Sequence, residues 1–270
     1  MKLMTHYLKK QISILGILVL IIAVIGFGIY FLIKPPKATC YDNIQNQGEN
    51  GIDCGGPCGQ CDKPQELSVI YQNFILTTEN NFDLVAKVEN PNSGWAVESM
   101  VYTFNIYKGE DLLLSKEGRI YILPQETKHI IEQKIFLNET PDRVEIKFKD
   151  ISWQKIKNLE DLEIRIKNEN REILPESGFN RLLGVVENKS DYDFDKIEII
   201  GVLLSNDKIV AVGKTEIRTV VRGESRYFEM NWPYEISDEI TSFELRTHTN
   251  IFLNDNFIKT HGTMEKFKGF

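Results

Sequence analysis

One long apolar run stands out in the hydrophobic pattern, near the N-terminus. Residues 12–33 carry no charged side chain, and sixteen of these 22 residues are Ile, Leu, Val or Phe. As a helix rising about 1.5 Å per residue, the run would be ~33 Å long, enough to cross a hydrocarbon core of about 30 Å. The pattern predicts a transmembrane helix over 12–33, with a short segment, 1–11, before it.

Two other export signals contain an apolar run and fit this sequence less well. A cleaved signal peptide has an apolar region of about 7–15 residues and a small-residue cleavage site, and neither feature is present here. A lipoprotein signal needs a small residue just before its cysteine, whereas Lys37, Ala38 and Thr39 precede Cys40. We therefore expect an uncleaved anchor.

The charges on either side of the run predict its orientation. Lys2, Lys9 and Lys10 precede the run, and Lys34 and Lys37 follow it. Positive charge is retained on the cytoplasmic side of a membrane helix. We expect a single-pass protein of the cell membrane, with its N-terminus in the cytoplasm and its C-terminal domains outside.

The pattern changes after residue 66. Short β-type runs, alternating or continuously apolar, are then separated by turns rich in Asn, Gly, Asp and Pro. Such a pattern predicts antiparallel strands. The strands expected in the first half are Leu67–Leu76, Phe82–Glu89, Val97–Tyr107, Leu112–Tyr121, Thr127–Leu137 and Arg143–Ile151.

The second half repeats the first at a fixed spacing. The triplet Val88–Asn90 recurs 98 residues later as Val186–Asn188, and Pro124–Thr127 corresponds to Arg222–Ser225 at the same distance. Two motifs with one offset indicate an internal duplication.

From this repeat we predict a mainly β fold with two tandem immunoglobulin-like antiparallel β-sandwiches. About 90 residues suit a sandwich of some seven strands. After the helix, the expected order is a cysteine-rich module with its linker at 34–65, a first sandwich at 66–152, a linker at 153–161, a second sandwich at 162–254 and a C-terminal tail at 255–270.

All four cysteines, Cys40, Cys54, Cys58 and Cys61, lie within 22 residues. So short a segment cannot bury a core. Outside the cytoplasm, two disulfides are expected to hold it together, and sequence leaves all three pairings open. The alternative is a four-cysteine zinc site in which the Cys58-x-x-Cys61 pair forms one half.

The same segment contains a candidate calcium site. Asp42, Asn46, Glu49 and Asp53 place oxygen donors among its glycines. Calcium accepts such ligands, although the spacing is not that of an EF-hand loop. Turn formation, which Asp, Asn and Gly favour, is the alternative explanation. No other cofactor is expected.

The segment from Cys40 to Cys61 resembles a short module of bacterial and archaeal surface proteins, with the pattern C-x-D-x-x-x-N-x-x-E-x-x-x-D-C-G-G-x-C-x-x-C. The match is specific and covers the whole segment. This resemblance implies an envelope location and no known catalytic role.

A second resemblance lies in the sandwiches. Phe104-Asn-Ile-Tyr-Lys108 resembles the signature of FxLYD-type domains, and the order V-x-N, strand, hairpin, P-x-E-T is similar to late-embryogenesis-abundant type 2 sandwiches. The second repeat has Val202–Asn206 in place of the aromatic signature. The resemblance implies non-enzymatic domains appended to envelope proteins.

Charge and missing motifs exclude several function classes. Residues 1–33 hold three lysines and no acid, so the remainder carries 29 basic against 39 acidic residues. An acidic surface repels phosphate backbones, and we expect no nucleic-acid binding. The four histidines, His6, His129, His248 and His261, form no zinc-protease pair and are expected at the surface or in turns.

Two sequons, Asn138-Glu-Thr140 and Asn188-Lys-Ser190, fit sites of N-glycosylation. They matter only in a cell that modifies such sites. The sequence contains no nucleophile elbow and no dinucleotide-binding motif.

We expect a non-enzymatic, membrane-anchored protein that presents two sandwiches to a protein partner in the envelope. One alternative is a subunit of a pilus or secretion-type surface complex. The other is a sandwich that binds a small ligand or lipid in a cavity between sheets. The sequence leaves the oligomeric state open.

Overall fold

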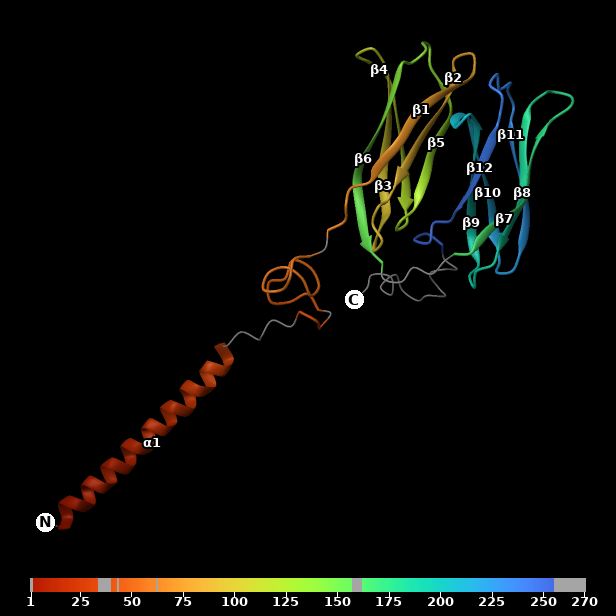
Figure 1. The fold of residues 1–270 in the computed structure, drawn as a ribbon. Helices are drawn as coiled ribbons and strands as arrows, with labels where there is room; N and C mark the ends of the chain where they lie inside the picture. The colour runs from red at the N-terminus through yellow and green to blue at the C-terminus, as the bar shows by residue number, and fades with distance from the viewer. Residues whose placement is uncertain (1, 34–39, 43, 62, 157–161, 255–270) are drawn as a thin grey trace. The chain divides into compact units, whose positions relative to one another are not determined.

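The structure is a computed structural model that describes residues 2–33, 40–42, 44–61, 63–156 and 162–254 (Figure 1). The chain divides into two compact units, residues 1–62 and 63–270, which are described separately below. The expected tail at 255–270 and residues 157–161 of the expected linker lie outside the described residues.

Helix α1, Lys2–Ile33, covers the predicted span and begins well before it. Between Lys10 and Tyr30 its mean hydropathy is 3.0, and none of this stretch is buried within the protein. Leu15 and Leu20, for example, are 65% and 66% exposed. By length and composition the helix can cross a membrane, and its apolar side chains need an apolar environment that the described residues do not supply.

The described part of the second unit contains twelve strands in four three-stranded antiparallel sheets. The first six strands are β1 Ser68–Thr78, β2 Asn81–Glu89, β3 Trp95–Lys108, β4 Asp111–Ile122, β5 Thr127–Phe136 and β6 Arg143–Lys155. The second six are β7 Ile164–Ile173, β8 Asn180–Asn188, β9 Phe194–Ser205, β10 Lys208–Val220, β11 Ser225–Trp232 and β12 Ser242–His248. All six strands expected in the first half are present, with ends shifted by a few residues.

The first sandwich packs sheet β1-β2-β5 against sheet β4-β3-β6. Alternate residues of β2, such as Phe82 and Leu84, meet Phe104 and Ile106 of β3 in one core, where each is at most 1% exposed. This two-residue period is the one on which the sequence prediction was based.

The second sandwich repeats this plan with sheets β7-β8-β11 and β10-β9-β12, each strand lying close to 98 residues after its counterpart. Its core includes Phe194, Met230 and Trp232. Gly201 and Gly213 face each other across β9 and β10. A Cβ atom would lie 2.7 Å from the Met230 sulfur at Gly201 and 2.5 Å from it at Gly213, so close packing of Met230 requires both glycines.

The two sandwiches pack on each other through one sheet from each, so that the four sheets lie as successive layers (Figure 1). The contact is an apolar cluster of Ile75, Val85 and Ile131 from sheet β1-β2-β5 with Ile200, Val202, Leu204, Ile209 and Val212 from sheet β10-β9-β12. Both middle sheets are thus covered on two faces. Strands β2 and β9 are therefore buried almost continuously.

Two details differ from the sequence prediction. The linker expected at 153–161 begins later, because Trp153 and Lys155 still pair with Val97 and Trp95 of β3 and extend β6. The backbone N–H of Ile156 then donates to the carbonyl of Gly94 at 2.9 Å. Each sandwich also has six strands among the described residues, rather than about seven.

Candidate functional site

The cysteine-rich module is closed by two disulfides, Cys40–Cys58 and Cys54–Cys61. The structure thereby selects one of the three possible pairings and leaves no cysteine free. A thiolate zinc site needs free sulfurs, so the zinc alternative does not fit this structure. The disulfides agree with the expected oxidising, extracytoplasmic setting.

The candidate calcium ligands lie together inside this module. Asp53 Oδ1 accepts the Asp42 N–H at 2.9 Å, and Asp42 Oδ2 accepts the Asn46 side-chain amide at 3.0 Å. Glu49 is 8% exposed, and its Oε2 accepts the N–H groups of Asn46 and Asp53, each at 3.2 Å. These bonds are those of a folded turn. Calcium binding stays a prediction, which calcium titration of the oxidised protein checks.

Mismatched cysteine variants test the disulfide pairing. The matched variant Cys54→Ser/Cys61→Ser should keep the Cys40–Cys58 bridge and show no labelled thiol after denaturation in iodoacetamide. The mismatched variant Cys40→Ser/Cys61→Ser removes one partner from each bridge. We expect two labelled thiols in it by mass spectrometry. The pairing would be contradicted if the mismatched variant showed no labelled thiol and the matched variant showed two.

The repeated Asn of each V-x-N motif is a buried hydrogen-bonding centre. Asn90 is 0% exposed, and its Nδ2 donates to the carbonyls of Trp95 at 2.7 Å and Leu123 at 2.9 Å. Its Oδ1 accepts the backbone N–H of Asn92 at 3.1 Å and the Asn92 side-chain amide at 2.8 Å. One side chain thus joins the end of β2 to the start of β3 and the end of β4.

Asn188 makes the same bonds in the second sandwich. Its Nδ2 donates to the carbonyls of Tyr192 at 2.7 Å and Val220 at 3.1 Å, and its Oδ1 accepts the N–H and hydroxyl of Ser190 at 3.1 and 2.6 Å. The two motifs therefore recur because each sandwich needs the same buried joint. The role is structural, not catalytic.

The two sequons differ in how exposed their asparagines are. Asn188 is 0% exposed and its amide is fully used, whereas Asn138 is exposed in the turn after β5. In a host that glycosylates exported sequons, glycopeptide mass spectrometry should find glycan at Asn138 and none at Asn188. Asn138→Gln serves as the matched control and should abolish the signal. Glycan on Asn188 would contradict the buried placement.

A cluster of charged side chains lies where the two sandwiches meet. Glu126, in the turn before β5, forms an ion pair with Lys128 Nζ at 3.4 Å and accepts a hydrogen bond from His248 Nδ1 of β12 at 2.7 Å. Lys128 is 1% exposed, donates to the Tyr121 carbonyl at 3.0 Å and lies 3.3 Å from the centre of the Tyr121 ring. The Glu126–His248 bond directly links the first sandwich to the second.

Burial and charge set the protonation of this cluster. Burial alone would raise the pKa of Glu126, but the Lys128 ammonium and the His248 ring lower it to about 2. Burial lowers the pKa of Lys128, and Glu126 opposes this. Burial also lowers the pKa of His248, against the bond to Glu126. The carboxylate of Glu126 therefore stays ionised and accepts the Nδ1–H of a neutral His248.

Sequence reasoning misplaced two of the four histidines. His129 and His248 are 4% and 6% exposed, not at the surface, because the second sandwich covers this part of β5 and the first covers this end of β12. Burial, followed by the charge of Lys87, lowers the pKa of His129 to about 4. No local signal in the sequence reveals contact between strands so far apart. His261 lies outside the described residues.

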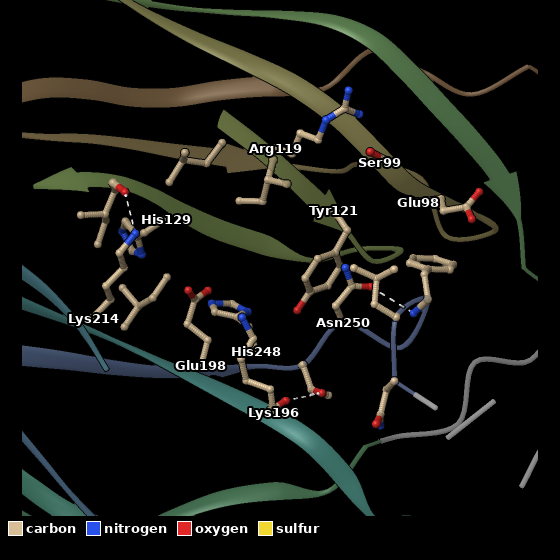
Figure 2. A pocket seen from close by; sticks show the side chains of 18 of the residues that line it. Glu98, Ser99, Arg119, Tyr121, His129, Lys196, Glu198, Lys214, His248 and Asn250 are labelled. Carbon is tan, nitrogen blue, oxygen red and sulfur yellow. Dashed lines mark hydrogen bonds between the residues drawn. The ribbon is translucent and has the colours of Figure 1, made fainter. Parts of the chain in front are cut away.

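A cavity of about 580 Å³ adjoins the charged cluster. It lies between the β4 and β5 edges of the first sandwich and the β9 face of the second, and Figure 2 shows the polar side chains that point into it. Its apolar walls include Ile120, Ile131, Ile200 and Phe252, and its polar lining includes Tyr121, His129, Glu198 and His248. The cavity is of a size that holds a small organic molecule.

Comparison with known proteins adds little to these observations. No family model matches the sequence, and no curated protein matches it significantly. A solved structure, the transglutaminase of red sea bream, is similar over 74% of this chain and 31% of its own chain, at 12% identity and a TM-score of 0.21. The chain thus spans about a third of that protein's length, and at this TM-score the likeness supports no argument. The FxLYD-like and late-embryogenesis-abundant-like assignments remain predictions.

Proposed function

We propose that this chain is a single-pass membrane protein whose N-terminus lies in the cytoplasm and whose paired sandwiches stand outside the cell membrane and bind an envelope protein. The observation that carries the proposal is the order of the helix and the cysteine-rich module along the chain. An apolar helix that the described residues leave uncovered is followed by a module closed by two disulfides. The first needs a lipid environment, and the second needs an oxidising one.

The described body supports a binding role. The two sandwiches share the apolar contact and the Glu126–His248 bond, so they form one body rather than two independent domains joined by a linker. The buried Asn and partly buried Glu side chains of the repeated motifs are engaged in holding strands together. The resemblances to an envelope module and to FxLYD-type domains point to the same role.

Protease added to intact cells tests the topology. We expect complete loss of the sandwiches from the outside, with a protected N-terminal fragment that contains α1. A reporter fused before Lys2 should stay protected, as the matched control. An intact body after digestion, in cells whose outer barrier has been opened, would overturn the proposal.

Crosslinking in intact cells tests the partner. We expect a reproducible crosslink between the sandwich body and another envelope protein, identified by mass spectrometry. Crosslinks to many components of one pilus or secretion machine would instead support the alternative function. A body that crosslinks to no protein would contradict the binding role.

A further inference from the structure

The cavity between the sandwiches contains a buried hydrogen-bonding atom with no protein partner. His248 is 6% exposed and donates its Nδ1–H to Glu126 at 2.7 Å. Its Nε2 is buried and has no hydrogen-bond partner among the described residues. A buried polar atom left unpaired is costly, so this atom marks a place where a ligand group can bind.

The fixed tautomer decides what that group must be. Because an ionised Glu126 takes the Nδ1–H, the neutral ring leaves Nε2 as a hydrogen-bond acceptor. A ligand atom opposite Nε2 must therefore donate a hydrogen bond. A hydroxyl or an amine can do this, whereas a carboxylate cannot.

A carboxylate beside this atom favours a cationic donor. Glu198 of β9 lines the same cavity, and Figure 2 shows its side chain pointing into it together with His248. The charge of Glu198 acts on both His248 and Tyr121. An ammonium group can donate to Nε2 and to this carboxylate at once, and hydrogen bonds between charged groups are the stronger ones.

The remaining walls fit an apolar body. Ile120, Ile131, Ile200 and Phe252 line the cavity, and the Phe252 ring meets Tyr121 edge-to-face with centroids 6.5 Å apart. Such side chains accommodate an aromatic or branched aliphatic group.

Three cations also line the cavity, and two of them are bonded to other acceptors. Lys196 lies 3.6 Å from Glu216, and Lys214 Nζ donates to the Ile131 carbonyl at 3.4 Å. Arg119 is exposed on β4. The buried Lys128, which acts on His248 and on which Glu198 acts, is paired with Glu126 at 3.4 Å and does not line the cavity. Among the lining residues, His248 and Glu198 therefore remain the acceptors at the buried end.

We propose that this cavity binds a small primary amine with an aromatic or branched apolar body, its ammonium group held by His248 Nε2 and Glu198. The inference goes beyond the proposed envelope role and is independent of it, because ligand binding here requires no protein partner.

Binding of 2-phenylethylamine to the full-length protein in nanodiscs tests the proposal. Isothermal titration calorimetry should show saturable binding. Phenylacetate, which has the same ring and an acceptor-only head, should show none, and ethylamine, which lacks the ring, should bind much more weakly. Equal or tighter binding of phenylacetate, or no saturable binding of 2-phenylethylamine, would overturn the proposal without recourse to any variant.

A pair of variants locates the site. Glu198→Gln keeps the shape of the side chain and removes its charge, and it should weaken 2-phenylethylamine binding at least tenfold. Glu139→Gln, an equally conservative change at an exposed turn, should leave the affinity unchanged. Because both variants are measured in the same nanodiscs, partition of the amine into lipid affects both titrations equally and cancels from the ratio of the two affinities. Equal affinities for the two variants would place the amine elsewhere and refute the assignment.

Discussion

Replacing Asn90 with Ala should lower the midpoint of thermal unfolding by roughly 6–12 °C. The change removes two donors and the acceptor of a side chain that is 0% exposed, and with them its bonds to the carbonyls of Trp95 and Leu123 and to the backbone N–H of Asn92. Each buried group without a partner costs about 1–3 kcal/mol, so we expect a loss of about 3 kcal/mol in the free energy of unfolding. For a body of this size, 1 kcal/mol corresponds to about 2–4 °C.

The repeat supplies both a replicate and a control for this measurement. Asn188→Ala should have a similar effect, since its bonds are the same. Asn231→Ala removes an exposed amide that donates to Glu229 on the same strand, and we expect a change within ~0.5 kcal/mol. Thermal unfolding of the full-length protein in detergent, followed by tryptophan fluorescence, distinguishes them. Equal midpoints for all three variants would contradict the structural role of the V-x-N motifs.

Acidification from pH 6.5 to pH 4 should cost the folded body about 3 kcal/mol through His129 alone. Burial, and then Lys87, lowers the pKa of His129 from 6.5 to about 4. Between pH 6.5 and pH 4, the unfolded chain therefore binds a proton at His129, whereas His129 in the folded chain stays neutral over most of this range. Stability is unaffected well above the unfolded pKa of 6.5 and falls as the pH decreases through that value toward the folded pKa. His248, whose pKa burial also lowers, acts in the same direction.

The pH dependence can be assigned by substitution. His129→Gln removes the titrating group, and we expect its unfolding free energy to decline less steeply between pH 6.5 and 4 than that of the unaltered protein. His6→Gln, which changes a histidine ahead of the apolar run, should leave the decline unchanged. Chemical unfolding at several pH values provides the comparison. A steeper decline in the His129 variant, or a rise in stability on acidification, would show that the histidine is not buried uncharged.

The sequence was sufficient to predict individual strands. Their two-residue period and turn residues place β1 to β6 within a few residues, because alternate side chains of each strand meet the core of its sandwich. The duplicated motifs were found through spacing, although their physical reason, the joint formed by Asn90 and Asn188, was visible only in the structure. The transmembrane prediction needed only length and composition.

Contacts between distant segments could not be predicted. Nothing near His129 or His248 in sequence indicates that one sandwich covers the other, so both were expected at the surface. The cavity and its unpaired Nε2 follow from the same packing. The disulfide pairing depends on how the chain folds back between Cys40 and Cys61, and residue spacing does not encode that path. Likewise, only burial tells the two sequons apart.

The stacking of the sandwiches has a consequence for self-association. By the repeat, β1-β2-β5 is the counterpart of β7-β8-β11, and β4-β3-β6 is the counterpart of β10-β9-β12. The contact is therefore made by unlike sheets, a head-to-tail arrangement that, continued from copy to copy, would grow into an open-ended filament.

The two outer sheets carry charged residues that disfavour such growth. Ion pairs join Lys149 to Glu117 on β4-β3-β6 and Lys167 to Glu187 on β7-β8-β11, whereas the middle sheets meet through isoleucine, valine and leucine. Burying such pairs in a further layer would cost their solvation. A further layer is therefore disfavoured on these two sheets by the desolvation of their charged pairs.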